Sequence, residues 1–176
     1  MKKILSILVL TSIFFISCSD GDPGPQGPPG EDGLDGLGYT FERTVNLEYR
    51  SDFNYYSQVI DIPEAVDTFE PESDVVLVYR LELLDADDGG TVDSWSLLPQ
   101  NFFLEEGTIQ YVYNHTAADV EIILDGNYDL INLDAGFTDS QTFRIVVLPS
   151  ATFEANANVD FSNFGEVQER FNLSIN

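Results

Sequence analysis

Apolar and polar residues alternate one by one through most of residues 39–176, and this alternation restricts the chain to β structure. Successive side chains of a strand point to opposite faces of its sheet, so a period of two gives the strand one apolar face. The clearest run is 74–84, where every second residue from Val75 onward is apolar. Val76 and Val78 place apolar side chains on the other face as well, which predicts burial on both sides near the start of this strand.

Short stretches of this kind recur along residues 39–176, and turn residues separate them. Many short strands at this spacing are typical of an antiparallel β-sandwich, and an open barrel is the alternative. The region is long enough to bury a core of its own. The pattern predicts strands at 41–49, 57–62, 74–84, 91–98, 102–104, 108–114, 120–124, 128–133 and 141–148.

The end of the chain carries the helical pattern. Phe164, Val167 and Phe171 recur at helical spacing, which predicts an apolar face that packs on a sheet. Asn163 and Glu166 have the spacing of a capping box at the start of this helix. The predicted fold class is therefore mainly β, an antiparallel sandwich with one short C-terminal helix.

Residues 1–17 have the layout of a secretory signal peptide, with Lys2 and Lys3 followed by an apolar helical run. The run is shorter than the ~20 residues that a membrane-spanning helix needs. Phe15, Ile16 and Ser17 precede Cys18, and this arrangement resembles a bacterial lipobox, in which the cysteine is lipidated and becomes the new N-terminus. Phe15 stands where a lipobox usually has Leu. We expect acyl chains on Cys18 to anchor the chain in a membrane, because each buried methylene contributes ~0.8 kcal/mol. An ordinary signal peptide with a chance cysteine is the alternative.

Residues 18–38 form a second segment between the signal and the β domain. Ser19, Asp20 and Asp22 follow the cysteine and resemble the export signal of Bacteroidota lipoproteins, which sends them to the outer face of the outer membrane. A plain polar tether is the other interpretation of these residues. The sequence thus predicts an outer-membrane, lipid-anchored protein that faces the cell exterior.

Glycine occupies every third position from Gly21 to Gly36, and prolines lie between the glycines. Glycine fits the crowded axis of a collagen triple helix, and proline presets the extended polyproline backbone. Two interpretations follow: a homotrimer through residues 21–38, or an extended Gly/Pro-rich spacer of ~3.1 Å per residue. The later triplets carry Glu31, Asp32 and Asp35 without any lysine to pair with them, which favours the spacer.

The composition excludes some partners. The chain has 31 acidic and 7 basic residues, and two of the basic residues lie in the predicted signal. Nucleic acids are bound through Lys and Arg, so nucleic acid is excluded as a partner. A basic patch that docks on anionic lipid is excluded for the same reason. The single cysteine allows no disulfide within one chain.

Four aspartates form the best candidate for a cation site. Asp85, Asp87, Asp88 and Asp93 surround two glycines, with a spacing that partly matches a calcium loop. Ser96 stands where an EF-hand has its bidentate Glu, so the segment is not an EF-hand. A hairpin loop without a metal is the alternative, and no other cofactor is predicted.

The sequence gives little evidence for a catalytic site. His115 is the only histidine and lies in a predicted turn, and the sequence has no nucleophile elbow. We therefore expect no enzymatic activity. Aromatic residues could line a site for a sugar or a protein, although strand aromatics also build cores; these are Tyr55, Tyr56, Trp95, Phe102, Phe103, Tyr111 and Tyr113.

Four short segments at 95–100, 124–128, 143–149 and 159–162 (WSLLPQ, LDGNY, FRIVVLP and VDFS) carry a family resemblance, together with the N-terminus. The chain resembles a group of uncharacterised Bacteroidota surface lipoproteins that pair a collagen-like segment with a β domain. The resemblance implies anchoring and architecture but no activity. We expect a surface lipoprotein that displays a non-catalytic β domain for binding, adhesion or envelope structure. Its partner would be an extracellular protein or glycan.

Two other functions are alternatives. One is a carbohydrate-binding accessory protein of a polysaccharide-uptake system, and the other is a secreted hydrolase. An exposed row of aromatic residues across one sheet would favour the first alternative. A pocket with converging carboxyl groups of shifted pKa would favour the second.

Anchoring is tested by replacing the cysteine. We expect the Cys18→Ala variant to leave the membrane fraction, because it lacks the residue that takes the acyl chains. Fractionation and protease treatment of intact cells measure this, with the unchanged chain as the control. A variant that stays membrane-bound, or an unchanged chain that the protease cannot reach, contradicts the prediction.

Overall fold

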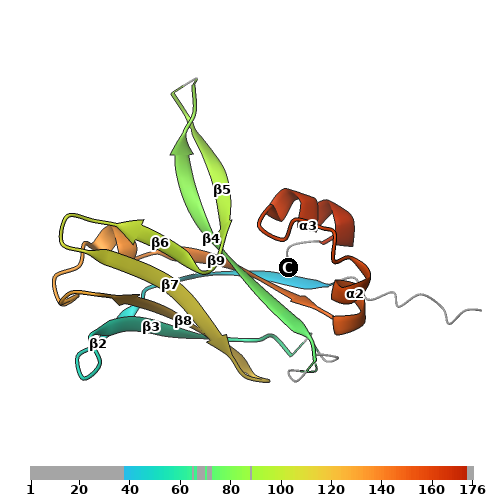
Figure 1. Cartoon of the computed structure of the whole chain (residues 1–176), viewed down its shortest axis with the longest axis horizontal. Coiled ribbons are helices and arrows are strands. Elements are labelled where there is room, and N and C mark those ends of the chain that lie inside the picture. Colours follow the sequence, from blue (N-terminus) through green and yellow to red (C-terminus); the bar gives the residue numbers. More distant parts are fainter. Residues whose placement is uncertain (1–37, 65, 67–69, 71–72, 88, 174–176) are drawn as a thin grey trace, which may run out of the picture. The chain divides into compact units, whose positions relative to one another are not determined.

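The computed structural model describes residues 38–64, 66, 70, 73–87 and 89–173, and this part of the chain is mainly β (Figure 1). The predicted signal, Cys18, Ser19, Asp20, Asp22 and almost all of the collagen-like segment lie outside the described residues. None of the helices in the described part is long and apolar enough to cross a membrane.

The strands form two antiparallel sheets. Sheet A has four strands in the order β1 (Tyr39–Val45), β9 (Gln141–Leu148), β4 (Val75–Asp85) and β5 (Thr91–Leu97). Sheet B has five strands in the order β2 (Glu48–Arg50), β3 (Tyr55–Asp61), β8 (Asp119–Gly126), β7 (Thr108–His115) and β6 (Gln100–Phe103). A 3₁₀ turn η2 (Ala135–Phe137) precedes β9, and the helices α2 (Ser150–Ala155) and α3 (Phe164–Phe171) follow it.

Two hydrophobic clusters hold these layers together. The larger cluster lies between the sheets and includes Phe41, Val78, Ile122 and Ile145. The second lies on the other face of sheet A, under the helices, and its members are Leu77, Tyr79, Val146, Leu148, Val159, Phe164, Val167, Phe171 and Leu173. The fold is thus a β-sandwich with helices on one outer face, which confirms the predicted fold class.

Strand β4 contributes to both clusters, as its sequence predicts. Val76 and Val78 point between the sheets, whereas Leu77 and Tyr79 point toward the helices. Its first half pairs with β9, but residues 81–85 pair only with β5. The β4–β5 hairpin therefore projects from the sandwich (Figure 1).

The predicted strand 41–49 is wrong as a single element. The chain leaves sheet A after Val45 and enters sheet B at Glu48. At the crossing, the Asn46 side chain accepts a hydrogen bond from the Ser140 amide at 2.7 Å, and buried Leu47 donates its amide to the Thr138 carbonyl at 2.8 Å. Alternation continues through the crossing because both halves line the same core, so periodicity alone conceals the break.

The predicted strand 128–133 is also wrong, because this segment is a loop. Its apolar residues do pack inward: Leu130 is fully buried, and Tyr128 and Leu133 are half-buried. The backbone, however, is held by side chains. Asn54 binds the loop at two points, and the Tyr56 hydroxyl donates to the Leu130 carbonyl at 3.1 Å.

The C-terminal helix is confirmed, and Phe164, Val167 and Phe171 are its buried residues. Asn163 accepts a hydrogen bond from the Glu166 amide at 3.4 Å. The Glu166 carboxylate accepts from the Asp160 amide, not from Asn163, so only half of the predicted capping box forms. The sequence pattern does not predict helix α2. Pro149 indicates only the end of the preceding strand, but it also stands at the N-cap of this short helix.

Two arginines are buried on opposite faces of sheet A. Arg80 of β4 lies on the side that faces sheet B, with its guanidinium over the Tyr111 and Phe102 rings at 4.6 and 5.3 Å. Its Nε donates to Gln141 at 2.9 Å, and its Nη1 lies 3.3 Å from the Glu82 carboxylate. A buried charge is tolerated only when it is paired and hydrogen-bonded, and these partners meet that requirement.

Arg144 of β9 lies on the helix side of the sheet. Its guanidinium stacks over Trp95 at 3.7 Å and over Phe164 at 4.2 Å. Its Nε donates to the Glu42 carboxylate of β1 at 2.7 Å, and its Nη2 donates to the same oxygen. Arg144 therefore connects β1, β5 and α3 from a central strand.

Burial of three tyrosines predicts a loss of stability at alkaline pH. The hydroxyls of Tyr79 and Tyr113 donate to backbone carbonyls at 2.6 and 2.7 Å, and Tyr111 donates to the Phe137 carbonyl. Burial raises the pKa of all three, for Tyr111 to about 12, against an ordinary value of 10.0. The folded chain thus favours the protonated phenols.

These tyrosines contribute fully to the free energy of unfolding below pH 10, where their hydroxyls are protonated in both the folded and the unfolded chain. The contribution is lost as the pH rises toward and through about 12. We expect the free energy of unfolding to fall by up to about 1.4 kcal/mol per pH unit for each buried tyrosine. Urea denaturation across this pH range measures the effect, and tyrosinate absorbance follows ionisation. Ionisation of all tyrosines in a chain that stays folded would contradict the prediction.

Candidate functional site

Three connecting segments meet at one end of sheet B. The β2–β3 turn follows the Arg50–Tyr55 pair, the β6–β7 turn follows the Phe103–Thr108 pair, and β8 ends at Gly126, which lies opposite Ile109. The segment 127–137 then leads to η2 at the same end (Figure 1). We call this the loop end of the sandwich.

Asn54 fixes two of these segments to each other. Its backbone is in the left-handed region, with φ 55°, a conformation that Asn adopts more readily than most residues. Its side-chain nitrogen donates to the Tyr128 carbonyl at 2.8 Å, and its side-chain oxygen accepts from the Leu130 amide at 2.8 Å. The loop is therefore held in one place without strand pairing.

Gly107 allows the β6–β7 turn to lie close to the same loop. Its φ is 154°, and a Cβ atom here would lie 2.2 Å from the side-chain oxygen of Asn127. That oxygen accepts a hydrogen bond from the Thr108 amide at 2.8 Å. A side chain at Gly107 would therefore push the two segments apart.

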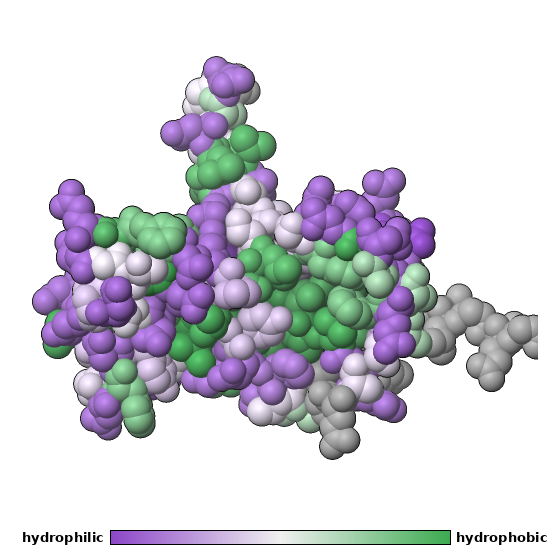
Figure 2. Space-filling view, in the orientation of Figure 1, coloured by the Kyte–Doolittle hydropathy of each residue, from purple (hydrophilic) through white to green (hydrophobic). Residues whose placement is uncertain are grey.

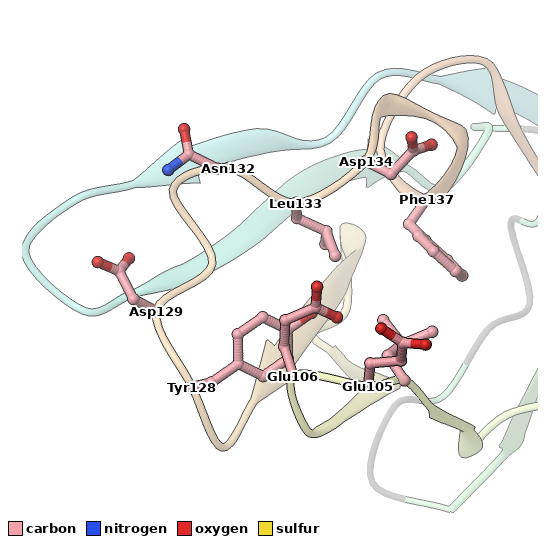
Figure 3. A pocket seen from close by; sticks show the side chains of 9 residues that line it. Glu105, Glu106, Tyr128, Asp129, Asn132, Leu133, Asp134 and Phe137 are labelled. Carbon is pink, nitrogen blue, oxygen red and sulfur yellow. The ribbon is translucent and has the colours of Figure 1, made fainter.

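The two segments enclose a cavity of about 570 Å³, which we call the acidic cup. Half-buried apolar side chains form its floor, and the carboxylates of two turns surround them. Figure 3 shows Tyr128, Leu133 and Phe137 pointing inward beside Glu105 and Glu106. The lining residues are Leu104, Glu105, Glu106, Tyr128, Asp129, Asn132, Leu133, Asp134 and Phe137.

The carboxylates of the cup have no cationic partner among the residues that the structure describes. Asp129 and Asp134 accept hydrogen bonds from backbone amides of their own loop, at 3.1 and 2.7 Å. Burial and, secondarily, the Glu106 carboxylate raise the pKa of Tyr128. The cup is thus a site of uncompensated negative charge over an apolar floor.

The arginines that could neutralise the cup are engaged elsewhere. Arg80 and Arg144 are buried in the networks described above. Arg50 pairs with Glu48 at 3.1 Å, Arg170 donates to Asn156 at 2.7 Å, and Arg43 donates to the Glu42 carbonyl at 2.7 Å. Residues 38–173 include no lysine, and none of these five arginines belongs to the lining of the cup.

Large exposed apolar side chains belong to the connecting segments of the loop end. Phe103 precedes the β6–β7 turn and is 84% exposed, and Ile131 lies within the cup loop and is 57% exposed. Phe53, next to Asn54 in the β2–β3 turn, is 72% exposed and stacks with Tyr55. We call these three residues the apolar rim. Figure 2 shows hydrophobic residues among hydrophilic ones at this end of the molecule.

The predicted cation residues lie elsewhere, on the β4–β5 hairpin. Asp85 ends β4, and Asp93 lies in β5 opposite Leu83, while Asp88 lies outside the described residues. Backbone bonds between Ala86 and Gly90 close a hairpin turn here. Among the residues with a described placement, no group of three or more His, Cys, Asp or Glu could hold a metal ion. The calcium site stays a prediction.

The other sequence candidates are not brought together into one site. His115 ends β7 at the opposite end of sheet B from the cup. Tyr111 is fully buried, and the half-buried Tyr56, Phe102, Tyr113 and Trp95 pack against the two clusters. The sequence pattern does not reveal the cup. Its acidic residues are typical of turns, and only the topology of sheet B brings the two turns together.

Comparison of the chain with protein-family models, with curated proteins and with solved structures gives no match. A functional inference for this protein therefore depends on the chemistry of its own surface. The acidic cup and the apolar rim are the features of that surface that combine a cavity, uncompensated charge and exposed apolar groups.

Proposed function

We propose that this protein is a cell-surface lipoprotein whose β-sandwich is a non-catalytic binding module for a basic segment of another extracellular protein. The observation that carries the proposal is the acidic cup, in which unpaired carboxylates surround an apolar floor. Acyl chains on Cys18 would hold the chain in the outer membrane, and the sequence pattern and the resemblance to Bacteroidota lipoproteins support this part.

The chemistry of the cup fits a cation on an apolar stem. Its volume of about 570 Å³ falls within the ~300–1,000 Å³ of typical ligand pockets. An ammonium or guanidinium group would meet Glu105 and Glu106, while the methylenes of a Lys or Arg side chain would lie on the floor. The faces of Tyr128 and Phe137 can add cation–π attraction.

The apolar rim favours a polypeptide over a small cation. A small amine would fill the cup and leave Phe53, Phe103 and Ile131 in water. A peptide with apolar residues next to its basic one would cover them, and each Å² of apolar surface so buried contributes ~25 cal/mol. A few anchors that become buried near the centre of an interface usually carry most of its binding energy.

The collagen-like segment would place this module away from the membrane. As a spacer, residues 21–38 would extend the chain by ~3.1 Å per residue. As a triple helix, they would present three modules together and raise the avidity for a repeated partner. Both arrangements serve binding or adhesion at the cell surface.

The alternative functions gain less support from the described residues. A carbohydrate-binding accessory protein with an aromatic platform would need a row of exposed rings across one sheet, but the exposed rings Phe53 and Phe103 lie at the loop end. A hydrolase that works through a histidine with a serine or cysteine nucleophile would need those side chains in the pocket, and the lining of the cup contains none of them. The carboxylates of the cup would suit a hydrolase that works with a pair of carboxyl groups.

A calorimetric titration tests the proposed function. The probes are a synthetic peptide of alternating Lys and Leu and the small cation ethylguanidinium, added to residues 19–176. We expect Glu105→Gln combined with Glu106→Gln to weaken binding of both probes at least about tenfold, because each carboxylate contributes a charged contact. Binding should also weaken at high salt.

Two control variants make this result specific. Glu154→Gln with Glu169→Gln removes the same charge from exposed positions outside the cup and should leave binding unchanged. Phe103→Ser with Ile131→Ser should weaken binding of the peptide only, whereas Leu84→Ser with Val92→Ser on the β4–β5 hairpin should not. Equal effects of the cup variant and its charge control would refute the proposal.

A further inference from the structure

A second cavity, of about 700 Å³, lies between the edge strand β5 and the start of α3. In Figure 1, α3 stands next to β5, which is one strand of the projecting hairpin. The lining differs from that of the acidic cup, because it is mainly polar and holds a guanidinium. We call it the polar cleft, and it is lined by Asp93, Ser94, Trp95, Arg144, Ser162, Asn163, Phe164, Gly165 and Gln168.

Arg144 is the rigid element of the polar cleft. Only 8% of its side chain is exposed, and Glu42, Trp95 and Phe164 hold it on three sides. The Glu42 carboxylate accepts hydrogen bonds from Nε and Nη2 of Arg144, and among the described residues Nη1 donates no hydrogen bond. Because Arg144 lines the cleft, Nη1 is the donor that a ligand there would meet.

The other polar groups of the cleft supply both donors and acceptors. Asp93 offers an exposed carboxylate, and Gln168 offers an exposed amide from α3. Asn163 uses its oxygen to cap α3, which leaves its amide nitrogen for a ligand. Ser94 adds a hydroxyl from β5. These groups lie around Trp95, which is half-buried and provides the apolar surface of the cleft, whereas Phe164 is buried behind it. The Arg144 guanidinium lies over one face of each ring.

The charges of the cleft select against an ionic ligand. Glu42 already neutralises Arg144, so an anion would gain little from the guanidinium and would be repelled by Asp93. A cation would find only one carboxylate in the lining, Asp93, with the guanidinium of Arg144 as a neighbour. A hydroxyl group both donates and accepts, so a ligand with several hydroxyls can satisfy Nη1, Asp93 and Gln168 together.

We propose that the polar cleft binds a neutral carbohydrate, whose hydroxyls meet Arg144, Asp93 and Gln168 and whose C–H face lies on the Trp95 side. This site is separate from the acidic cup and does not depend on the function proposed for it. The protein would then hold a glycan at the helix side of sheet A and a basic polypeptide at the loop end.

The single tryptophan makes the proposal testable, because Trp95 lies in the cleft and is the only Trp in the chain. Neutral oligosaccharides of β-1,4-glucose, β-1,3-glucose and mannose are added to a protein of residues 19–176, and the fluorescence emission of Trp95 is followed. We expect a saturable change in emission with one or more of them. Gln168→Ala and Asp93→Asn should each weaken binding about fivefold, as expected for one hydrogen bond.

Controls distinguish the cleft from other sites. Glu169→Ala on the same helix should leave the titration unchanged, because this residue is outside the lining. The cup variant with Glu105→Gln and Glu106→Gln should also leave it unchanged, so the two proposals fail separately. A saturable response to inorganic phosphate or sulfate but to none of the sugars, or no saturable response to any sugar, would overturn the proposal.

Discussion

The rest of the structure depends on the contacts that two buried arginines, Arg80 and Arg144, make inside the fold. They belong to neighbouring strands, and consecutive pairs in the β4–β9 register bring them close: Tyr79 lies opposite Arg144, and Arg80 lies opposite Phe143. One guanidinium points into the space between the sheets, and the other points under α3. A planar guanidinium can stack on rings and donate in its own plane at once, which a lysine cannot do.

Each arginine joins elements that are far apart in the sequence. Arg80 of β4 contacts rings from β6 and β7 of the opposite sheet, Phe102 and Tyr111. Arg144 connects β1 through Glu42 with β5 through Trp95 and with α3 through Phe164. Removal of the carboxylate partner is destabilising, because the charge of the arginine is then left buried and alone.

The burial of two arginines inside the fold leaves few positive charges on the surface. The described part of the chain has five arginines and no lysine, and two of the five are buried. Of the other three, only Arg50 pairs with a carboxylate, so most carboxylates of the described residues have no cationic partner. Where two acidic turns converge over Tyr128 and Phe137, that excess becomes the acidic cup. The same Arg144 that anchors α3 also forms one wall of the polar cleft.

The sequence predicts much of the fold, and its failures have physical causes. The sequence identifies β4 and β9 well, because strands that are buried on both faces appear as near-continuous apolar runs. It fails at Leu47 and Leu130, which are buried in crossings and loops and continue the alternation without continuing a strand. The loop end is invisible in sequence, because Glu105 and Asp129 come together only through the register of β6, β7 and β8.

The free energy of unfolding of the Arg144→Lys variant, measured by urea denaturation of residues 19–176, tests the central role of the buried arginines most directly. Lysine keeps the charge but loses the flat stack on Trp95 and Phe164 and the double contact with Glu42. We predict a loss of about 2 kcal/mol or more. The exposed Arg43→Lys control should stay within about 0.5 kcal/mol of the unchanged chain. An Arg144→Lys variant as stable as this control would contradict the account.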